Sequence, residues 1–130
     1  MFFELEIRPR ICDTDMLGHI NNTVPPVWLE EGRTYFFKHI FQPPTSMPPL
    51  LIRHIEMDFK AELFQHSEVL LQTSIKGFGN TSVKMHQEIH QNGRCCFIGT
   101  STLVFVDPET RKPCPVPDSV KTGFAPYLLV

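Results

Sequence analysis

The stretch CDTDMLGHINNTVPPVW, residues 12–28, brings acids, amides and a histidine together just ahead of a helix. Its chemistry-bearing side chains are Asp13, Asp15, His19, Asn21 and Asn22. The N-terminus of a helix offers backbone N–H groups without helical partners and the positive end of the helix dipole. A carboxylate can therefore lie beside a site that stabilises a developing oxyanion. This combination suits acyl transfer, in which one group attacks or activates water while backbone donors hold the oxyanion.

The flanking sequence predicts the elements that position this loop. Residues 2–11 alternate apolar and charged side chains, which indicates a strand with one face in solvent. From residue 26 to residue 41 the apolar side chains fall on one broad helical arc, which predicts a single long helix. The proline-rich segment 42–49 ends that helix, because proline cannot donate to the helical ladder and disfavours a helical residue before it.

Four more runs alternate like strands, within residues 51–63, 67–77, 81–91 and 94–106. The last connections are short turns, so we expect mostly antiparallel pairing. A lone helix with an apolar face needs a sheet to cover it. The sequence therefore predicts an α+β fold, one antiparallel sheet wrapped around one long central helix, in a single domain spanning residues 1–130. The proline-rich tail, DPETRKPCPVPD, is expected to lie over the surface.

Composition excludes several classes of protein. The chain has 12 basic and 14 acidic residues, a net charge of −2 at pH 7 and no dense basic run, so nucleic acid is not expected as a partner. No apolar stretch is long enough for a membrane span, and charges near the N-terminus argue against a signal peptide, which predicts a cytoplasmic protein. The four cysteines lack metal-type spacing and are expected to be packed thiols; only the reactivity of Cys12, beside the polar loop, stays open.

The run DTDMLGHINN followed by WLEEGR resembles the signature of hotdog-fold acyl-CoA thioesterases of the 4-hydroxybenzoyl-CoA thioesterase type. The resemblance spans most of the chain, because HIEMDFKAELFQHSEVLL is similar to the second and third strands of that family and TSTLVFVDPETRKPCPVP to its last strand and exit. It implies the hotdog fold, a homodimer or homotetramer with active sites between subunits, and hydrolysis of an acyl-CoA or acyl carrier protein thioester. It also implies a reaction without metal or cofactor.

The same resemblance assigns roles to individual residues. Asp15 matches the catalytic carboxylate of the family, which acts as nucleophile or as general base on water. The backbone N–H of Asn22 matches the oxyanion donor, and His19 matches the histidine that orients the thioester or water. Apart from the resemblance, contacts with substrate are expected from Asn21, Thr23 and Trp28, and polar contacts with pantetheine from Thr81 and Ser82, which start a strand after a glycine turn.

Two prolines depart from the family pattern. Pro25 stands where family members commonly carry an aromatic residue, and Pro26 follows it. Neither has an N–H to donate, and Pro26 disfavours a helical conformation at Pro25, so we expect the helix to begin near Pro26. Either the Asn22 amide lies in a well-ordered loop or the oxyanion site is rearranged.

Two other functional classes share this fold. Hotdog hydratases usually carry an aspartate and a histidine five residues apart, whereas Asp15 and His19 are four apart and Asp13 and His19 are six apart, so the spacing argues against a hydratase. A non-catalytic acyl-CoA- or lipid-binding hotdog protein stays open, because the twin prolines alter the segment expected to hold the oxyanion. Turnover of a thioester would distinguish that protein from an enzyme.

Several acidic residues have simpler interpretations. Aspartates before helices often cap them or close Asx turns, which is the structural alternative for Asp13 and Asp15. On the helix, Glu30 is expected to form a surface pair with Arg33. Glu31 lies nearer the apolar arc and is the reserve candidate for nucleophile or base.

A metal site is not expected. His86 and His90 have a spacing that binds zinc on a helix, but on a strand they lie too far apart to share an ion. Four strand cations stay open between contact with CoA phosphates and simple solvation, namely Arg53, Lys60, Lys76 and Lys84.

Overall fold

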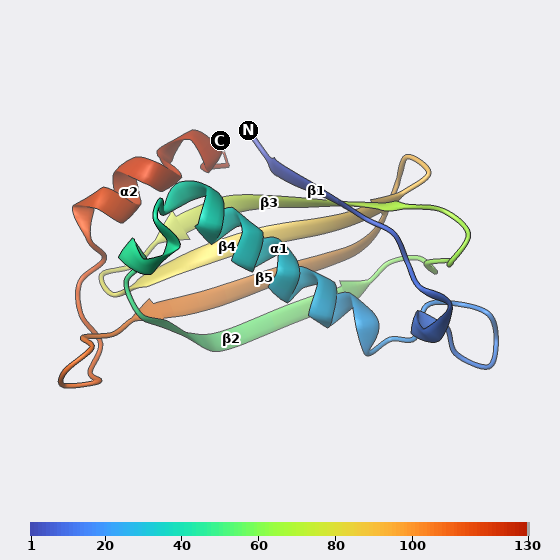
Figure 1. Ribbon diagram of the computed structural model, residues 1–130, viewed down its shortest axis with the longest axis horizontal. Helices are drawn as coiled ribbons and strands as arrows, with labels where there is room; N and C mark the ends of the chain where they lie inside the picture. The colour runs from blue at the N-terminus through green and yellow to red at the C-terminus, as the bar shows by residue number, and fades with distance from the viewer. Residues whose placement is uncertain (130) are drawn as a thin grey trace.

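The computed structural model describes residues 1–129 and contains a five-stranded sheet with one long helix lying across one of its faces (Figure 1). The strand order is β1-β3-β4-β5-β2, and every neighbouring pair is antiparallel. The strands are β1 (Phe3–Ile7), β2 (Leu50–Phe59), β3 (Val69–Phe78), β4 (Ser82–Gln91) and β5 (Arg94–Phe105). The helices are α1 (Val24–Ile40) and α2 (Asp118–Phe124), with 3-10 turns at Ile11–Asp13, Pro44–Ser46 and Ala125–Tyr127. The predicted fold class, an antiparallel sheet packed on one long helix, is confirmed.

Helix α1 approaches the sheet closely because glycines stand at the contact points. A β-carbon at Gly32 would collide with Leu71 of β3 and lie 2.9 Å from Gln87 Nε2 of β4. A β-carbon at Gly99 of β5 would collide with Leu29 of the helix. Apolar side chains fill two clusters between helix and sheet. No helix in the described part of the chain is both long and apolar enough to cross a membrane.

One buried charge interrupts this apolar layer. Arg33 of α1 is only 5% exposed, and its Nη1 donates to Gln87 Oε1 at 3.2 Å. Gln87 Nε2 in turn donates to the Leu29 carbonyl at 3.0 Å and to Thr73 Oγ1 at 3.1 Å. Burial lowers the pKa of Arg33, and the charge of nearby Glu30 opposes that shift. The expected surface pair between Glu30 and Arg33 is wrong, because the guanidinium lies between helix and sheet while Glu30 is exposed.

Helix α1 begins at Val24, two residues before the expected start at Pro26. Thr23 occupies the N-cap position, so Pro25 and Pro26 both lie in the first helical turn. The N–H groups of this turn have no partner within a helix, so prolines there cost no hydrogen bond. The fit of both prolines to the first helical turn outweighs the preference for extended backbone that Pro26 imposes on Pro25.

The C-terminal segment contributes to the core, which the sequence did not indicate. Within the expected surface tail, residues 107–115 are exposed or half-buried, but Val116 is buried in the core. Beyond them, α2 carries Phe124 to the C-terminal half of α1, where its ring stacks on Phe37. The Leu129 N–H donates to the Ile75 carbonyl of β3 at 2.8 Å. The end of the chain therefore covers the part of β3 that β1 leaves unpaired.

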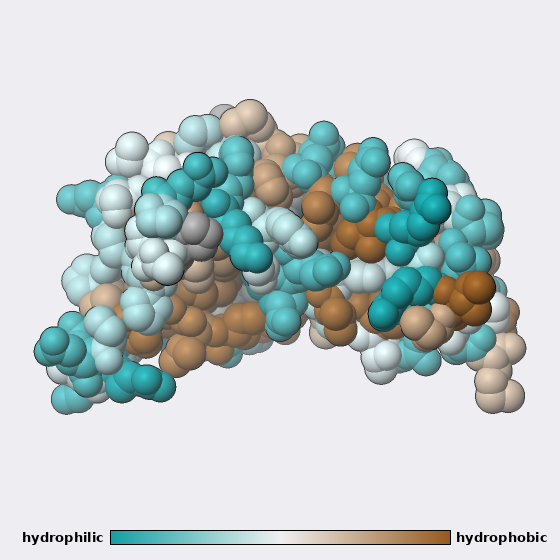
Figure 2. Space-filling view, viewed as in Figure 1, coloured by the Kyte–Doolittle hydropathy of each residue, from teal (hydrophilic) through white to brown (hydrophobic). Residues whose placement is uncertain are grey.

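Strand β2 forms an open edge of the sheet. Within the described residues it pairs only with β5, and every β2 residue after Leu50 is exposed. Four of its apolar side chains lie opposite helix-facing residues of β5 and are 38–57% exposed; we call Ile52, Ile55, Met57 and Phe59 the β2 row. Helix α1 packs chiefly on β3 and β1, so hydrophobic surface stays open along the lower side of Figure 2. A free strand edge beside an exposed apolar row marks an interaction surface.

Candidate active site

The loop between β1 and α1 folds into a small hairpin at one end of the sheet (Figure 1). The Asp15 N–H donates to the His19 carbonyl at 2.8 Å, and the Gly18 N–H donates to the Asp15 carbonyl at 3.2 Å. Gly18 has a φ of +83°, which glycine adopts without strain. The Asp15 carboxylate closes an Asx turn, with Oδ1 accepting from the Leu17 N–H at 2.8 Å. The turn fixes the carboxylate and leaves Oδ2 without a hydrogen bond to residues 1–129.

Asp13 anchors the base of this hairpin. It is 2% exposed, and its carboxylate accepts from the Arg10 backbone N–H at 2.8 Å and from Arg10 Nη2 at 2.9 Å. Burial acts to raise the pKa of Asp13, but the hydrogen bonds from Arg10 outweigh it and hold the pKa below its usual value. The Asp13 carbonyl accepts from the Asn21 N–H at 2.8 Å, which ties the two ends of the hairpin together. Asp13 therefore stabilises the loop.

A second set of contacts joins the hairpin to the segment after β2. The Ile20 N–H donates to the Leu63 carbonyl at 2.8 Å, and the His19 ring meets Phe64 edge-on, with centroids 5.2 Å apart. His19 Nδ1 lies 3.3 Å from Glu62 Oε1, and the two side chains are 30% and 63% exposed. This contact leaves Nε2 as the ring nitrogen that a ligand can meet. Sequence reasoning missed Glu62, because its relation to His19 arises only from the fold.

A cavity of about 400 Å³, here called the Asp15 cavity, opens beside the hairpin. The three expected catalytic residues, Asp15, His19 and Asn22, all line it. Phe59 of β2 and Phe97 of β5 form an apolar wall, with ring centroids 4.8 Å apart and the rings nearly perpendicular. Phe97 was not identified from the sequence, because nothing in a strand pattern distinguishes a cavity wall from a core position. The cavity combines a carboxylate, an imidazole and an apolar wall.

The N-terminus of α1 leaves one backbone donor free beside this cavity. The N–H groups of Thr23 and Val24 both bond to Asn21, at 2.9 Å to its Oδ1 and at 3.0 Å to its carbonyl. The two prolines that follow have no N–H. The backbone N–H of Asn22 makes no hydrogen bond to any described residue, and Asn22 lines the cavity. The Asn22 N–H is therefore the donor that remains at the positive end of the helix dipole.

Three of the residues expected to contact substrate have structural positions near the loop. Asn21 and Thr23 bond to each other, and Thr23 Oγ1 also donates to Asn21 Oδ1 at 2.8 Å. Trp28 is 5% exposed and packs in a core cluster. Glu31, the reserve candidate, is exposed and lines a different hollow beside Trp28. None of these four residues lines the Asp15 cavity.

The other two expected contacts, Thr81 and Ser82, lie at the opposite end of the sheet. Ser82 pairs with the C-terminal part of β5, whereas the cavity is built at the N-terminal part of that strand. Ser82 shares a separate hollow of about 420 Å³ with Lys76 and Lys84. Lys60, directly after the end of β2, is the candidate cation that lines the Asp15 cavity. Within one chain, the expected substrate contacts therefore fall into two groups.

Several known proteins are similar to this chain. A family model described as the thioesterase-like superfamily matches residues 9–124. A predicted thioesterase from Bacillus stearothermophilus is 36% identical, with 99% of this chain and 98% of that chain covered and a TM-score of 0.90. A thioesterase from Thermus thermophilus, complexed with coenzyme A and Zn, is 23% identical, with 95% and 92% covered and a TM-score of 0.86. YsmA of Bacillus subtilis (strain 168) is 26% identical over 110 residues, 82% of this chain and 74% of YsmA.

Proposed function

Since the chain belongs to the thioesterase-like superfamily, we propose that it hydrolyses an acyl-CoA thioester to a free acid and CoA. The family and fold expected from the DTDMLGHINN motif, a thioesterase with the hotdog fold, are confirmed. The observation that carries the proposal is that Asp15, His19 and the free Asn22 N–H surround one cavity. In this proposal the chain acts as one domain.

The proposed reaction begins with the thioester carbonyl oxygen at the Asn22 N–H, where the positive end of the α1 dipole stabilises the oxyanion. Asp15 then acts in one of two ways. As nucleophile, its carboxylate bonds to the carbonyl carbon, the C–S bond breaks, CoA leaves as thiolate, and water hydrolyses the resulting anhydride. As general base, Asp15 takes a proton from water while the water oxygen bonds to the carbonyl carbon, and the departing thiolate receives that proton.

His19 and Glu62 orient the reacting groups in this proposal. The negative charge of Glu62, 3.3 Å from His19 Nδ1, favours the tautomer of a neutral imidazole that has its proton on that nitrogen. Nε2 is then a hydrogen-bond acceptor for the attacking water. Glu62 thus acts through His19 and is a positioning residue.

The proposed assembly is a homodimer formed through β2. Two copies related by a two-fold axis pair their β2 edges antiparallel, which satisfies the free backbone groups of both edges. This pairing covers the β2 row, whose last member, Phe59, lines the Asp15 cavity. The partner would therefore close the cavity on the Phe59 side. Association of two such dimers gives the homotetramer, the other state implied by the family resemblance.

Substrate class and location follow from the remaining residues. Lys60 at the cavity offers a cation for the phosphates of CoA. The chemistry needs no cofactor, because a carboxylate, water and a backbone donor suffice. The four cysteines are all free, which is typical of proteins in a reducing compartment and favours a cytoplasmic location.

A non-catalytic acyl-CoA- or lipid-binding protein is the second candidate function. The observation in its favour is the pair of prolines in the first turn of α1, which removes two N–H groups from the oxyanion end of the helix. Such a protein would bind a thioester and protect it from hydrolysis.

Thiol release from a panel of aromatic, short-chain and long-chain acyl-CoAs tests both candidates, with a correction for the four cysteines of the protein. Turnover by the wild type supports the thioesterase and identifies the acyl class. The same acyl groups on acyl carrier protein distinguish the two carriers. No turnover of any thioester, together with tight binding of one, would overturn the enzyme and favour the binding protein.

A further inference from the structure

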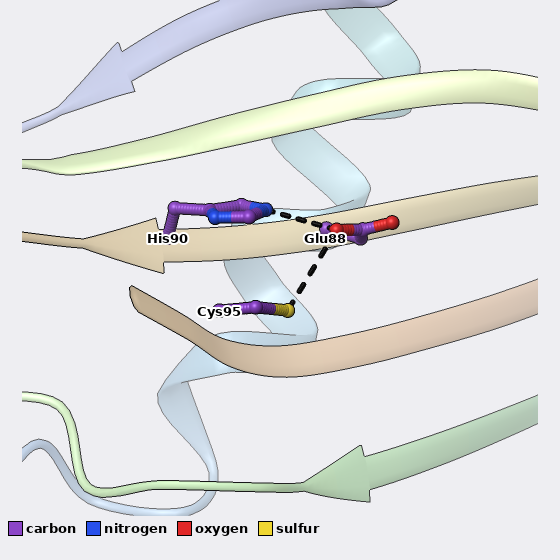
Figure 3. Close-up of side chains that lie close together, drawn as sticks. All are labelled: Glu88, His90 and Cys95. Carbon is purple, nitrogen blue, oxygen red and sulfur yellow. Dashed lines mark hydrogen bonds and ion pairs between the residues drawn. The ribbon is translucent and has the colours of Figure 1, made fainter. Parts of the chain in front are cut away.

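A cluster of metal-ligand side chains lies on the face of the sheet opposite α1 (Figure 3). Glu88 and His90 extend from β4 and Cys95 from β5, and one ligand atom of each lies within 4.8 Å of the others. His90 Nε2 is 2.9 Å from Glu88 Oε1, and Cys95 Sγ is 3.7 Å from the same oxygen. We call these three half-buried residues the Glu88 cluster. An imidazole and a thiol therefore converge on a single carboxylate oxygen.

Strand geometry brings these ligands together. Alternate residues of β4 face outward, so Glu88 and His90 share one face while Ile89 between them is buried. A register shift between Ile89 and His90 sets Cys95 opposite His90. In an unshifted ladder Cys96 would take that place, and its side chain is buried in the core. The irregularity therefore aims the thiol of Cys95 at Glu88.

The surroundings hold the cluster in place. Strands β4 and β5 are each paired on both sides, so the backbone that carries the ligands is fixed. His86 Nε2 bonds to the second carboxylate oxygen of Glu88 at 2.6 Å, and hydrogen bonds of this kind orient ligand carboxylates in metal sites. The sequence predicted no metal site, because His86 and His90 lie too far apart on a strand and the cysteines lack metal-type spacing. The Glu88 cluster uses one of these histidines and takes its third ligand from the neighbouring strand.

The donor set matches one class of ion. Imidazole nitrogen, thiolate sulfur and carboxylate oxygen are the ligand atoms that Zn²⁺ takes in proteins, whereas Mg²⁺ and Ca²⁺ take oxygen ligands. We propose that the Glu88 cluster binds one Zn²⁺ per chain, with the fourth coordination position left to water. On binding, the thiol proton of Cys95 passes to solvent, and the thiolate and carboxylate together neutralise the two charges of the ion.

The proposed ion links β4 to β5 close to the turn that joins them. Cys95 is followed by Cys96, whose carbonyl accepts from the Lys60 N–H at 2.9 Å and the Ala61 N–H at 3.1 Å. Lys60 and Ala61 line the Asp15 cavity, which lies on the other face of the sheet. The ion therefore stabilises a strand end that supports the cavity, without touching the substrate. Its effect is on stability rather than on the chemical step.

Metal titration tests the site directly. Protein freed of metal with a chelator is titrated with Zn²⁺ against a chromogenic competitor, and in parallel with Co²⁺ as a spectroscopic probe. We expect one ion per chain, a thiolate-to-cobalt charge-transfer band, and a rise in melting temperature on adding Zn²⁺, because an ion bound only by the folded state stabilises it.

Matched variants identify the ligands. Cys95→Ser and His90→Gln should each weaken Zn²⁺ binding at least tenfold, and Cys95→Ser should also remove the charge-transfer band. Cys114→Ser is the control for loss of a thiol, because Cys114 is another free, half-buried cysteine. His54→Gln is the control for loss of an imidazole. His54 also lies 3.2 Å from a glutamate, Glu56, but among the described residues it belongs to no cluster of three metal-ligand side chains.

Circular dichroism and thermal melting of the metal-free proteins check that each variant folds. Glu88→Gln is a third ligand variant with the same expected loss, so the test survives if one of the others does not fold. Absence of one tightly bound ion per chain would overturn the proposal. So would unchanged affinity in Cys95→Ser and His90→Gln, or a loss in His54→Gln as large as the loss in His90→Gln.

Discussion

Two groups of histidine and glutamate in this protein differ in exposure and in the kind of backbone that carries them. On the inner strand β4, Glu88 accepts from His86 at 2.6 Å and from His90 at 2.9 Å, and their side chains are 17–26% exposed. At the candidate active site, His19 and Glu62 lie 3.3 Å apart on loop segments and are 30% and 63% exposed. The strand holds its side chains at a fixed spacing, so their polar atoms satisfy one another. The loop leaves polar atoms free for a substrate.

The free groups are those that the proposed reaction needs. One oxygen of Asp15 and the backbone N–H of Asn22 have no hydrogen bond to the described residues. Catalytic donors and acceptors must be held in place yet available to the transition state. We therefore expect substitutions at the loop to change turnover, and substitutions on the outer face of the sheet to leave turnover unchanged.

Replacing one carboxylate by an amide in the loop and another on the sheet gives the largest expected difference in turnover. Asp15→Asn keeps an oxygen for the Leu17 N–H but removes the nucleophile or base. We expect kcat to fall at least about 100-fold, about 2.7 kcal/mol of barrier, with the melting temperature unchanged. Glu4→Gln is the matched control, because Glu4 is a carboxylate of β1 that already accepts from Gln72 at 2.8 Å. Equal turnover in Asp15→Asn and Glu4→Gln would contradict the proposed role of Asp15.

A charge placed on the open β2 edge of the sheet is expected to have the next largest effect on turnover. Met57→Lys places a charge in the β2 row, and two such charges would meet in a dimer formed through β2. We expect a monomer and a loss of turnover of at least about tenfold, about 1.4 kcal/mol, because the cavity loses the wall supplied by the partner.

Sedimentation or light scattering gives the mass, and Glu56→Gln, next to Met57 on the other face of β2, is the control that should keep the dimer. Zinc binding at the Glu88 cluster should persist in the Met57→Lys monomer, because that cluster lies on inner strands. A wild-type monomer with full activity would contradict the proposed assembly.

The buried anchor of the loop makes stability depend on pH. The pKa of Asp13 lies below its usual value, because the Arg10 hydrogen bonds outweigh the opposing effect of burial. A carboxyl whose pKa is lowered on folding adds stability above its unfolded pKa of about 3.9, and this stability is lost as pH falls through the folded pKa. Asp13→Asn should lower the free energy of unfolding by about 1–2 kcal/mol at neutral pH and flatten its decline in acid. Denaturant unfolding at several pH values measures this; the same acid dependence in both proteins would contradict it.

Much of the scaffold could be predicted from local patterns. The two-residue alternation marks the strands, the helical arc marks α1, and the polar motif marks the loop of the candidate site. The sequence predicts the start of α1 two residues too late, because the fit of Pro25 to the first helical turn outweighs its preference for extended backbone before Pro26. Local patterns therefore define elements well and their ends less well.

Features that depend on distant contacts could not be predicted. Arg33 looks like a surface residue in the sequence, because its partner Gln87 is 54 residues away. The outward direction of Cys95 depends on an irregularity in the β4–β5 ladder that no residue type announces. The helix at the C-terminus is short, and it is held by packing of Phe124 on α1 rather than by its own pattern. In each case the deciding energy comes from tertiary contacts.

The contact between Glu62 and His19 also joins residues that are distant in the sequence. Breaking it is expected to give the smallest change in turnover. Glu62→Gln keeps the length of the side chain but removes the charge that holds the proton on His19 Nδ1. We expect kcat to fall by about threefold, about 0.6 kcal/mol, with KM unchanged. Glu31→Gln, an exposed glutamate outside the cavity, is the control. Because Glu62 acts only through His19, Glu62→Gln should have no further effect in a His19→Gln background, and equal losses in both backgrounds would show that Glu62 acts independently.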